Sequence, residues 1–204
     1  AGAAGGLAAA ALAAIVAWIA GEAGDHPTAA IPGDALVGID ARSGRATEPV
    51  ALGGSPSGVA VTDGAVWVGD RSRGAVKRID PERGAVVQTI PAGGGPDCIA
   101  AGEGSVWATN ALDGTLLRIS PLADAVVQTI PVPNGPRGVA VADGSVWVAS
   151  RYARTLARID AATGETRLTA RIGGSPIGIA VGAGAVWTTH ETDAQVWRHD
   201  PRTE

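Results

Sequence analysis

The sequence repeats itself every 40 residues, and this repeat limits the possible folds more than any other feature. Four full units run from position 34 to 193, a fifth begins at 194, and four residue types recur in phase, starting at Pro56, Gly64, Trp67 and Arg78. Repetition with a period of 20–50 residues is typical of solenoids, propellers and related arrays. The chain is therefore expected to use one supersecondary unit several times.

One unit reads as four short strands joined by tight turns. The pieces "SGVAV", "AVWVGD", "AVKRID" and "AVVQTIP" are rich in Val and Ile, and Asp-Gly and Pro-x-x-Gly segments separate them. "VAV" is apolar on both faces, which is typical of a strand packed between layers, and the 3.6-residue period of a helical solenoid is absent. Four-stranded sheets stacked radially are the blades of a β-propeller, so the sequence predicts an all-β propeller of 40-residue blades.

The phase of the repeat predicts a partial propeller over residues 34–204. It would hold three complete blades, a leading piece of two strands and a trailing piece of three. Such an arc exposes apolar blade faces at its ends, so self-association through these open edges is a further expectation.

Residues 1–21 form an apolar stretch without a charge, and residues 22–33 read as a linker. As a helix the first segment would be roughly 32 Å long, close to the ~30 Å hydrocarbon core of a bilayer. It is predicted to be a transmembrane or signal-anchor helix, with a cleaved signal peptide and a disordered Ala/Gly linker as alternatives. The first two readings place the propeller at the cell membrane on its extracytoplasmic side, or in a secreted or periplasmic form.

The composition argues against several classes of function. The net charge is −4 and no basic stripe is present, so nucleic acid is not an expected partner. Cys98 is the single cysteine, which excludes an internal disulfide and a Cys-rich metal site, and we interpret it as an inert thiol. No phosphate loop or metal cluster is recognisable, so neither a cofactor nor a metal is predicted.

The in-phase tryptophans are interpreted as a packing wedge between blades rather than as an aromatic platform for a ligand: Trp67, Trp107, Trp147 and Trp187. Trp197 stands outside this set and is expected to be exposed. The in-phase arginines are interpreted as structural, paired with Asp40, Asp80 or Asp160, and these aspartates are expected to cap turns.

"VWATN" at 106–110 and "VVQTIPVPNGP" at 126–136 resemble the YVTN-type β-propeller repeat, a relative of the NHL propellers. The resemblance implies that the Gly-Val-Ala-Val strand is innermost, that the Gln-Thr-Ile strand is outermost, and that a whole ring has about seven blades. The Ala-, Gly- and Arg-rich usage resembles that of high-GC actinobacteria. Membrane proteins there join a cytoplasmic regulatory module to such a propeller, which implies a sensor.

Candidate binding residues lie where the repeats stop agreeing. The turns "TDG", "GEG", "ADG" and "GAG" are nearly alike, whereas the loops 70–75, 110–115, 150–155 and 190–195 differ. Residues that maintain the fold must be similar in every unit, whereas residues that bind a partner can differ between units. A ligand or protein is therefore expected on the face formed by these loops. The alternative is that their polar residues are ordinary solvated ones; the candidates are Asp70, Arg71, Asn110, Arg151, Tyr152, His190 and Glu191.

His190 and Glu191 are the weak candidates for catalysis. "WTTHE" at 187–191 is similar to pieces of streptogramin B lyases, and a histidine can act as a general base. A second histidine in a matching loop is missing, and His199 on the next strand is expected to point away from the loop. The favoured reading is an extracytoplasmic ligand- or protein-binding domain of a larger membrane-anchored protein, with a lyase or a purely structural scaffold as alternatives.

Overall fold

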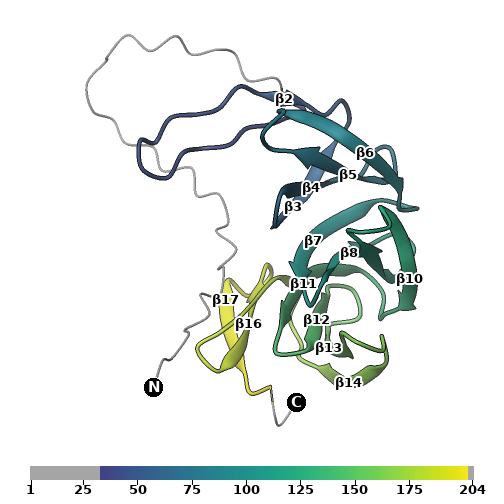
Figure 1. Ribbon diagram of the computed structural model, residues 1–204. Coiled ribbons are helices and arrows are strands. Elements are labelled where there is room, and N and C mark those ends of the chain that lie inside the picture. The colour runs from purple at the N-terminus through teal and green to yellow at the C-terminus, as the bar shows by residue number, and fades with distance from the viewer. Residues whose placement is uncertain (1–32, 202–204) are drawn as a thin grey trace, which may run out of the picture. The chain divides into compact units, whose positions relative to one another are not determined.

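The computed structural model describes residues 33–201, and strands joined by turns form this part of the chain (Figure 1). A short two-stranded sheet comes first, formed by β1 (Ala35–Leu36) and β2 (Val50–Ala51). Three antiparallel sheets of four strands follow, and an antiparallel sheet of three strands comes last. The prediction of an all-β chain with repeated four-stranded sheets is confirmed.

Each sheet is called a blade here. The first blade contains β3 (Pro56–Thr62), β4 (Ala65–Asp70), β5 (Ala75–Asp80) and β6 (Ala85–Pro91). The second contains β7 (Pro96–Gly102), β8 (Ser105–Asn110), β9 (Thr115–Ser120) and β10 (Ala125–Pro131). The third contains β11 (Pro136–Ala142), β12 (Ser145–Ser150), β13 (Thr155–Asp160) and β14 (Thr166–Arg171). The fourth contains β15 (Pro176–Gly182), β16 (Ala185–His190) and β17 (Gln195–His199).

The blades follow one another so that their first strands are neighbours. β3 lies beside β7, β7 beside β11, and β11 beside β15. Figure 1 shows β3, β7 and β11 on the inner side of this arc, and β6, β10 and β14 on its outer side. This order agrees with the implication that the Gly-Val-Ala-Val strand is innermost.

Local turn chemistry explains why the strands end where they do. Gly104, Gly144 and Gly184 have φ of 69°, and the residue before each also has positive φ, which is the geometry of a tight hairpin turn. At the other hairpins, Asp80 Oδ1 accepts the N–H groups of Glu82 and Arg83 at 2.9 and 3.0 Å. Asp40 and Asp160 make the same kind of turn cap, as expected.

Neighbouring blades pack through two different sides. The tryptophan side of one blade meets the valine side of the next, so Trp67 packs with Val106 and Ala108. Trp107 packs with Val146 and Val148 in the same way, and Trp147 packs with Val186. These three tryptophans are buried at the inter-blade contacts and present no ring face for a ligand.

The in-phase arginines support this packing. The guanidinium carbons of Arg78, Arg118 and Arg158 lie 5.4–5.6 Å from the ring centroids of their tryptophans, a cation–π arrangement. Arg78 also forms an ion pair with Asp124 of the next blade at 2.8 Å. The expected pairing with Asp40, Asp80 or Asp160 is wrong for these three arginines. Besides the Arg78–Asp124 pair, Arg118 and Arg158 donate to the Ala162 and Pro201 carbonyls beyond their own blades.

Apolar side chains are exposed at both ends of the arc. On the valine side of β3, Val59 and Val61 are 54% and 69% exposed, whereas Ile99 and Val139, the counterparts of Val59, are each 5% exposed. On the tryptophan side of the fourth blade, Trp187 is half-buried and Val196 is exposed. β1 and β2 pack their Leu36 and Val50 against the outer part of the first blade.

The predicted helix 1–21 and the predicted linker 22–33, apart from its last residue, lie outside the described residues. Among residues 33–201 no helix has the length and apolar character needed to cross a membrane.

Candidate functional site

The loops that vary between units and the linkers between blades lie together at one end of the sheets. Arg71 N–H donates to the Ser55 carbonyl at 2.9 Å, Arg151 N–H to that of Gly135 at 2.7 Å, and Glu191 N–H to that of Ser175 at 3.1 Å. Each bond joins the start of a loop to the linker that enters the same blade. We call this surface the variable-loop face: residues 70–75, 110–115, 150–155, 190–195 and the linkers 53–58, 93–98, 133–138, 173–178.

Three of the seven candidate residues are buried beneath this face rather than exposed on it. Asp70, Asn110 and His190 occupy the same position of the repeat and are 1–2% exposed. The Asp70 carboxylate accepts the Ser55 N–H at 3.1 Å, and the Asn110 amide donates to the Ala92 carbonyl at 2.8 Å. These polar groups hold the inter-blade linkers in place.

Asp70 forms a buried ion pair with Lys77, whose Nζ lies 2.9 Å from Asp70 Oδ2. Lys77 Nζ also donates to the carbonyls of Leu52 and Gly53. Burial raises the pKa of Asp70, but hydrogen bonds from Lys77, the Ser55 N–H, Ser72 and the Arg73 N–H outweigh it and hold that pKa at about 2. Asp70 is therefore ionised at neutral pH in spite of its burial.

The residues at these two positions change together from blade to blade. Positions 70 and 77 are diagonal neighbours on adjacent strands, since Val68 is paired with Lys77. The first blade has an ion pair there, Asp70 with Lys77, and the second has an amide beside an aliphatic side chain, Asn110 with Leu117. The third has two small residues, Ser150 with Ala157, and the fourth has two rings, His190 with Trp197. Because the residue at the first position changes together with its neighbour at the second, we infer that Asp70, Asn110, Ser150 and His190 serve mainly to pack their own blades.

The fourth blade holds two histidines on one buried threonine. Thr188 Oγ1 lies 2.9 Å from Nε2 of His190 and 2.8 Å from Nε2 of His199. The expectation that His199 points away from His190 is wrong, because His199 is paired with Val186 and projects on the same side of the sheet. Trp197 is exposed, at 36%, as expected, and one face of its ring stacks on His190 with ring centroids 4.8 Å apart.

Burial and neighbouring charges set the ionisation of His190. Burial lowers the pKa of His190, with Asp193 acting in the opposite direction and His199 in the same one. Glu191 forms an ion pair with Arg151 instead of meeting His190. Across residues 33–201, no three His, Cys, Asp or Glu side chains are grouped closely enough to hold a metal ion.

We expect the stability of the protein to fall as the pH drops from about 7 to about 5, and His190 to be one cause. The folded protein holds His190 neutral because its pKa is lowered, whereas the unfolded chain takes up a proton near pH ~6.5. His190→Ser, which introduces the residue of the third blade, should flatten this pH dependence. Chemical denaturation at a series of pH values measures it, and equal slopes for both proteins would contradict the expectation.

The exposed candidates form ion pairs that join one blade to the next. Asp97 begins the inner strand of the second blade and lies between Arg71 of the first and Arg137 of the third, with Arg137 Nε at 2.7 Å. Arg151 pairs with Glu191 across the third and fourth blades and lies 5.7 Å from the Tyr152 ring centroid. The side chains of Arg71, Arg137, Arg151 and Glu191 remain partly open to solvent.

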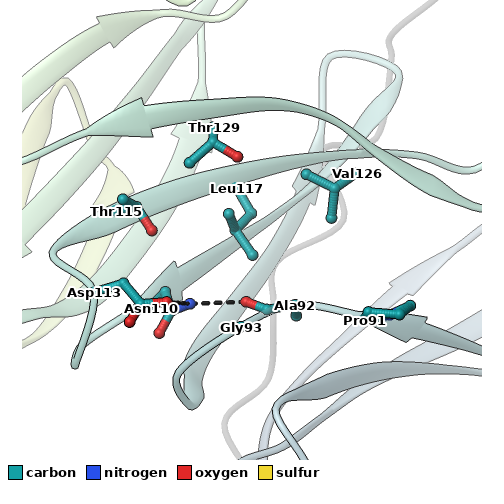
Figure 2. Close-up of a pocket in the computed structure, with 9 residues that line it drawn as sticks. All are labelled: Pro91, Ala92, Gly93, Asn110, Asp113, Thr115, Leu117, Val126 and Thr129. Carbon is teal, nitrogen blue, oxygen red and sulfur yellow. Dashed lines mark hydrogen bonds between the residues drawn. The ribbon is translucent and has the colours of Figure 1, made fainter.

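A cavity of about 250 Å³ lies between the first and second blades. Figure 2 shows Leu117 and Val126 on one side of it and the 91–93 segment on the other, with the Asn110 amide bonded to the Ala92 carbonyl. The Asn110 amide N–H groups bond to the Ala92 carbonyl and to the Asp113 carboxylate, so they are already paired at the edge of this cavity.

A second hollow, of about 420 Å³, opens on the variable-loop face of the third blade. Tyr152, Arg154 and Arg171 line it, and only Tyr152 is among the residues predicted from the sequence. Asp97, Arg137, Arg154 and Arg171 were missed. A signal for all four exists in the sequence, because each departs from the residues that other blades have at its position.

The comparisons with known proteins support the fold. No family model and no curated protein matches the sequence significantly. Among solved structures, a streptogramin B lyase has a TM-score of 0.68 at 19% identity, with 84% of this chain and 63% of that chain covered. Hydrazine synthase of Kuenenia stuttgartiensis has a TM-score of 0.66 at 16% identity, with 81% and 60% covered.

The computationally designed Ika4 protein has a TM-score of 0.63 at 14% identity, with 73% of this chain and 94% of that chain covered. The present chain thus spans somewhat less than two thirds of the lyase and synthase chains. Identities this low show the fold alone. The described residues share the fold of β-propeller proteins, as an arc of antiparallel blades that repeat every 40 residues.

Proposed function

We propose that this chain is a non-enzymatic binding domain of the YVTN-repeat type, and that its variable-loop face binds a ligand or a partner protein. One observation carries the proposal: side chains that differ from blade to blade meet there as inter-blade charge clusters whose arginines are partly open to solvent. The clusters are Arg71, Asp97 and Arg137, and Arg151 with Glu191. The opposite ends of the blades carry similar turns in every unit.

The energetics of exposed charges favour recognition over stabilisation. The Arg151–Glu191 pair is open to solvent on both sides, and such a pair contributes about 0–1 kcal/mol to stability, so it adds little that the repeated core lacks. The same charges can steer an oppositely charged partner and fix its orientation. Arg71 and Arg151 stand where the second blade has Ala111, which shows that the repeat does not require a charge at this position.

The domain is further proposed to be extracytoplasmic, anchored through residues 1–21, and to act as the sensor part of a larger membrane protein. The support is the charge-free apolar composition of residues 1–21. A lyase reaction with His190 as the base finds less support, because that ring is buried, stacked on Trp197 and bonded to Thr188.

The test compares two double variants with equal charge changes. Arg71→Ala with Arg151→Ala removes two arginines from the variable-loop face, whereas Arg42→Ala with Arg83→Ala removes two from the repeated turns at the opposite end. A panel of carboxylates, phosphate esters, glycans and acidic peptides is screened by thermal shift. Binding that weakens in the first variant and persists in the second is expected; weakening in the second alone, or a panel without any binder, would contradict the proposal.

A further inference from the structure

The hollow on the third blade is bounded by two backbone segments that are fixed to each other. Arg171 is the last residue of β14 and is paired with Thr155, the residue that follows Arg154. The Ile172 N–H also donates to the Arg154 carbonyl at 3.0 Å. The two arginines therefore start from neighbouring points of a rigid hairpin, and both side chains line the same space.

Both arginines are exposed and lack an anionic partner. Within residues 33–201, neither the Arg154 nor the Arg171 guanidinium takes part in an ion pair. The nearby Arg151 is balanced by Glu191, and it lies over the Tyr152 ring. The hollow thus carries two positive charges without compensation.

Tyr152 supplies a fixed aromatic wall. Its side chain is 68% exposed, yet the ring lies against Gly135, where an added Cβ would collide with it. Gly135, which has φ of 72°, leaves room for the ring because it carries no Cβ. The other blades have Ser72, Leu112 and Thr192 at this position.

Tyr152, Arg154 and Arg171 all depart from the residue types of the other blades, and Arg154 does so at a position of positive φ. Arg154 has φ of 56°, while its counterparts Gly74 and Gly114 have 58° and 64°. Ala194, the counterpart in the fourth blade, has φ of 49°, so the turn geometry is kept while the residue type changes. Arg171 replaces the prolines of the first two blades, Pro91 and Pro131.

From this arrangement we infer that Tyr152, Arg154 and Arg171 form a binding site for a phosphate- or sulfate-type oxyanion. Planar guanidinium groups donate paired N–H groups to such oxygens, and the tyrosine offers a hydroxyl donor and a ring face for an aromatic carrier. The site rests on the proposed function, because it gives the variable-loop face a ligand chemistry.

Tyr152 is the single tyrosine of the chain, so it reports on this site alone. The full chain with isotope-labelled tyrosine is titrated with phenyl phosphate, and the ring signals are followed by NMR. A saturable shift is expected, while benzyl alcohol, which has the ring without the charge, should give none. Inorganic phosphate as a third probe separates a free oxyanion from an aromatic ester, and binding of either one fits the inference.

The variants restore the residues of other blades, so folding is preserved. Arg154→Gly and Arg171→Pro should each weaken phenyl phosphate binding by roughly tenfold. The matched control is Arg167→Val, since Arg167 lies on the same strand, pairs with Asp160 and Glu165, and corresponds to Val87 and Val127. The control should bind like the unaltered protein.

An absent shift, or equal affinity in all three variants, would overturn the inference. That outcome is distinguishable from a failure of the proposed function. Ligands from the thermal-shift panel that depend on Arg71 and Arg151 would still bind, and the variable-loop face would keep its role with another chemistry.

Discussion

Replacing Asp70 with asparagine should lower the free energy of unfolding by about 3–5 kcal/mol. The substitution leaves the Lys77 ammonium, which is 3% exposed, without its anionic partner at 2.9 Å. Asparagine fits the position, as Asn110 shows in the second blade. Urea unfolding followed by tryptophan fluorescence measures the loss, and a change under about 1 kcal/mol would show that the buried ion pair is dispensable.

The double variant Asp70→Asn with Lys77→Leu is the matched control. It gives the first blade the Asn–Leu pair of the second blade and removes the uncompensated charge. Because replacing both members of a buried ion pair is often neutral, most of the lost stability should return. A double variant as unstable as the single one would mean that Asp70 acts mainly through the 53–58 linker.

The Asp70–Lys77 ion pair also predicts that the stability of the protein depends on pH in the acid range. The pKa of Asp70 is about 2 in the folded protein, against an ordinary value of 3.8. Its contribution to stability is therefore complete above pH ~4 and is lost as the pH falls toward ~2. The Asp70→Asn protein should lack this part of the acid transition.

Replacing Trp107 with alanine should lower the free energy of unfolding by about 3–5 kcal/mol. The side chain is 0% exposed, packs against Val146 and Val148, and donates its indole N–H to the Gly102 carbonyl at 3.3 Å. The loss of its ring also removes the cation–π partner of Arg118. The melting temperature and urea midpoint should both fall.

Trp187→Ala is the internal control for this prediction. Trp187 occupies the same repeat position and makes the same N–H bond, at 3.1 Å to Gly182, but it is only half-buried at the end of the arc. Trp187→Ala should lower the free energy of unfolding clearly less than Trp107→Ala does. Equal losses would mean that the inter-blade contact does not determine the stability contributed by this tryptophan.

The candidate site was only partly predictable. Comparison of the units located the loops that differ, but it treated consecutive residues such as Asp70 and Arg71 as equivalent. In the structure Asp70, the last residue of β4, is buried beside Lys77, whereas Arg71, the first residue of the turn that follows, is half exposed. In the same way His190 ends β16 in the interior beside His199, while Glu191 at the start of the loop reaches Arg151.

Side chains that come from different loops and strands were missed for a different reason. Arg154 and Arg171 belong to a loop and a strand end, and the hairpin pairing of β13 with β14 brings them to one hollow. Asp97 meets Arg71 and Arg137 only because three successive blades place their inner strands side by side.

The sequence by itself determined the architecture of residues 33–201: a period of 40 residues, four strands for each unit, and a tryptophan at every blade contact. Such features follow from local turn chemistry and alternating polarity, and they are repeated often enough to be unambiguous. Only the tertiary structure decided which side chains face the core, which face solvent and which charges meet. Those outcomes depend on contacts between residues far apart in the sequence, such as the ion pair of Asp97 with Arg137 of the next blade, which no local pattern encodes.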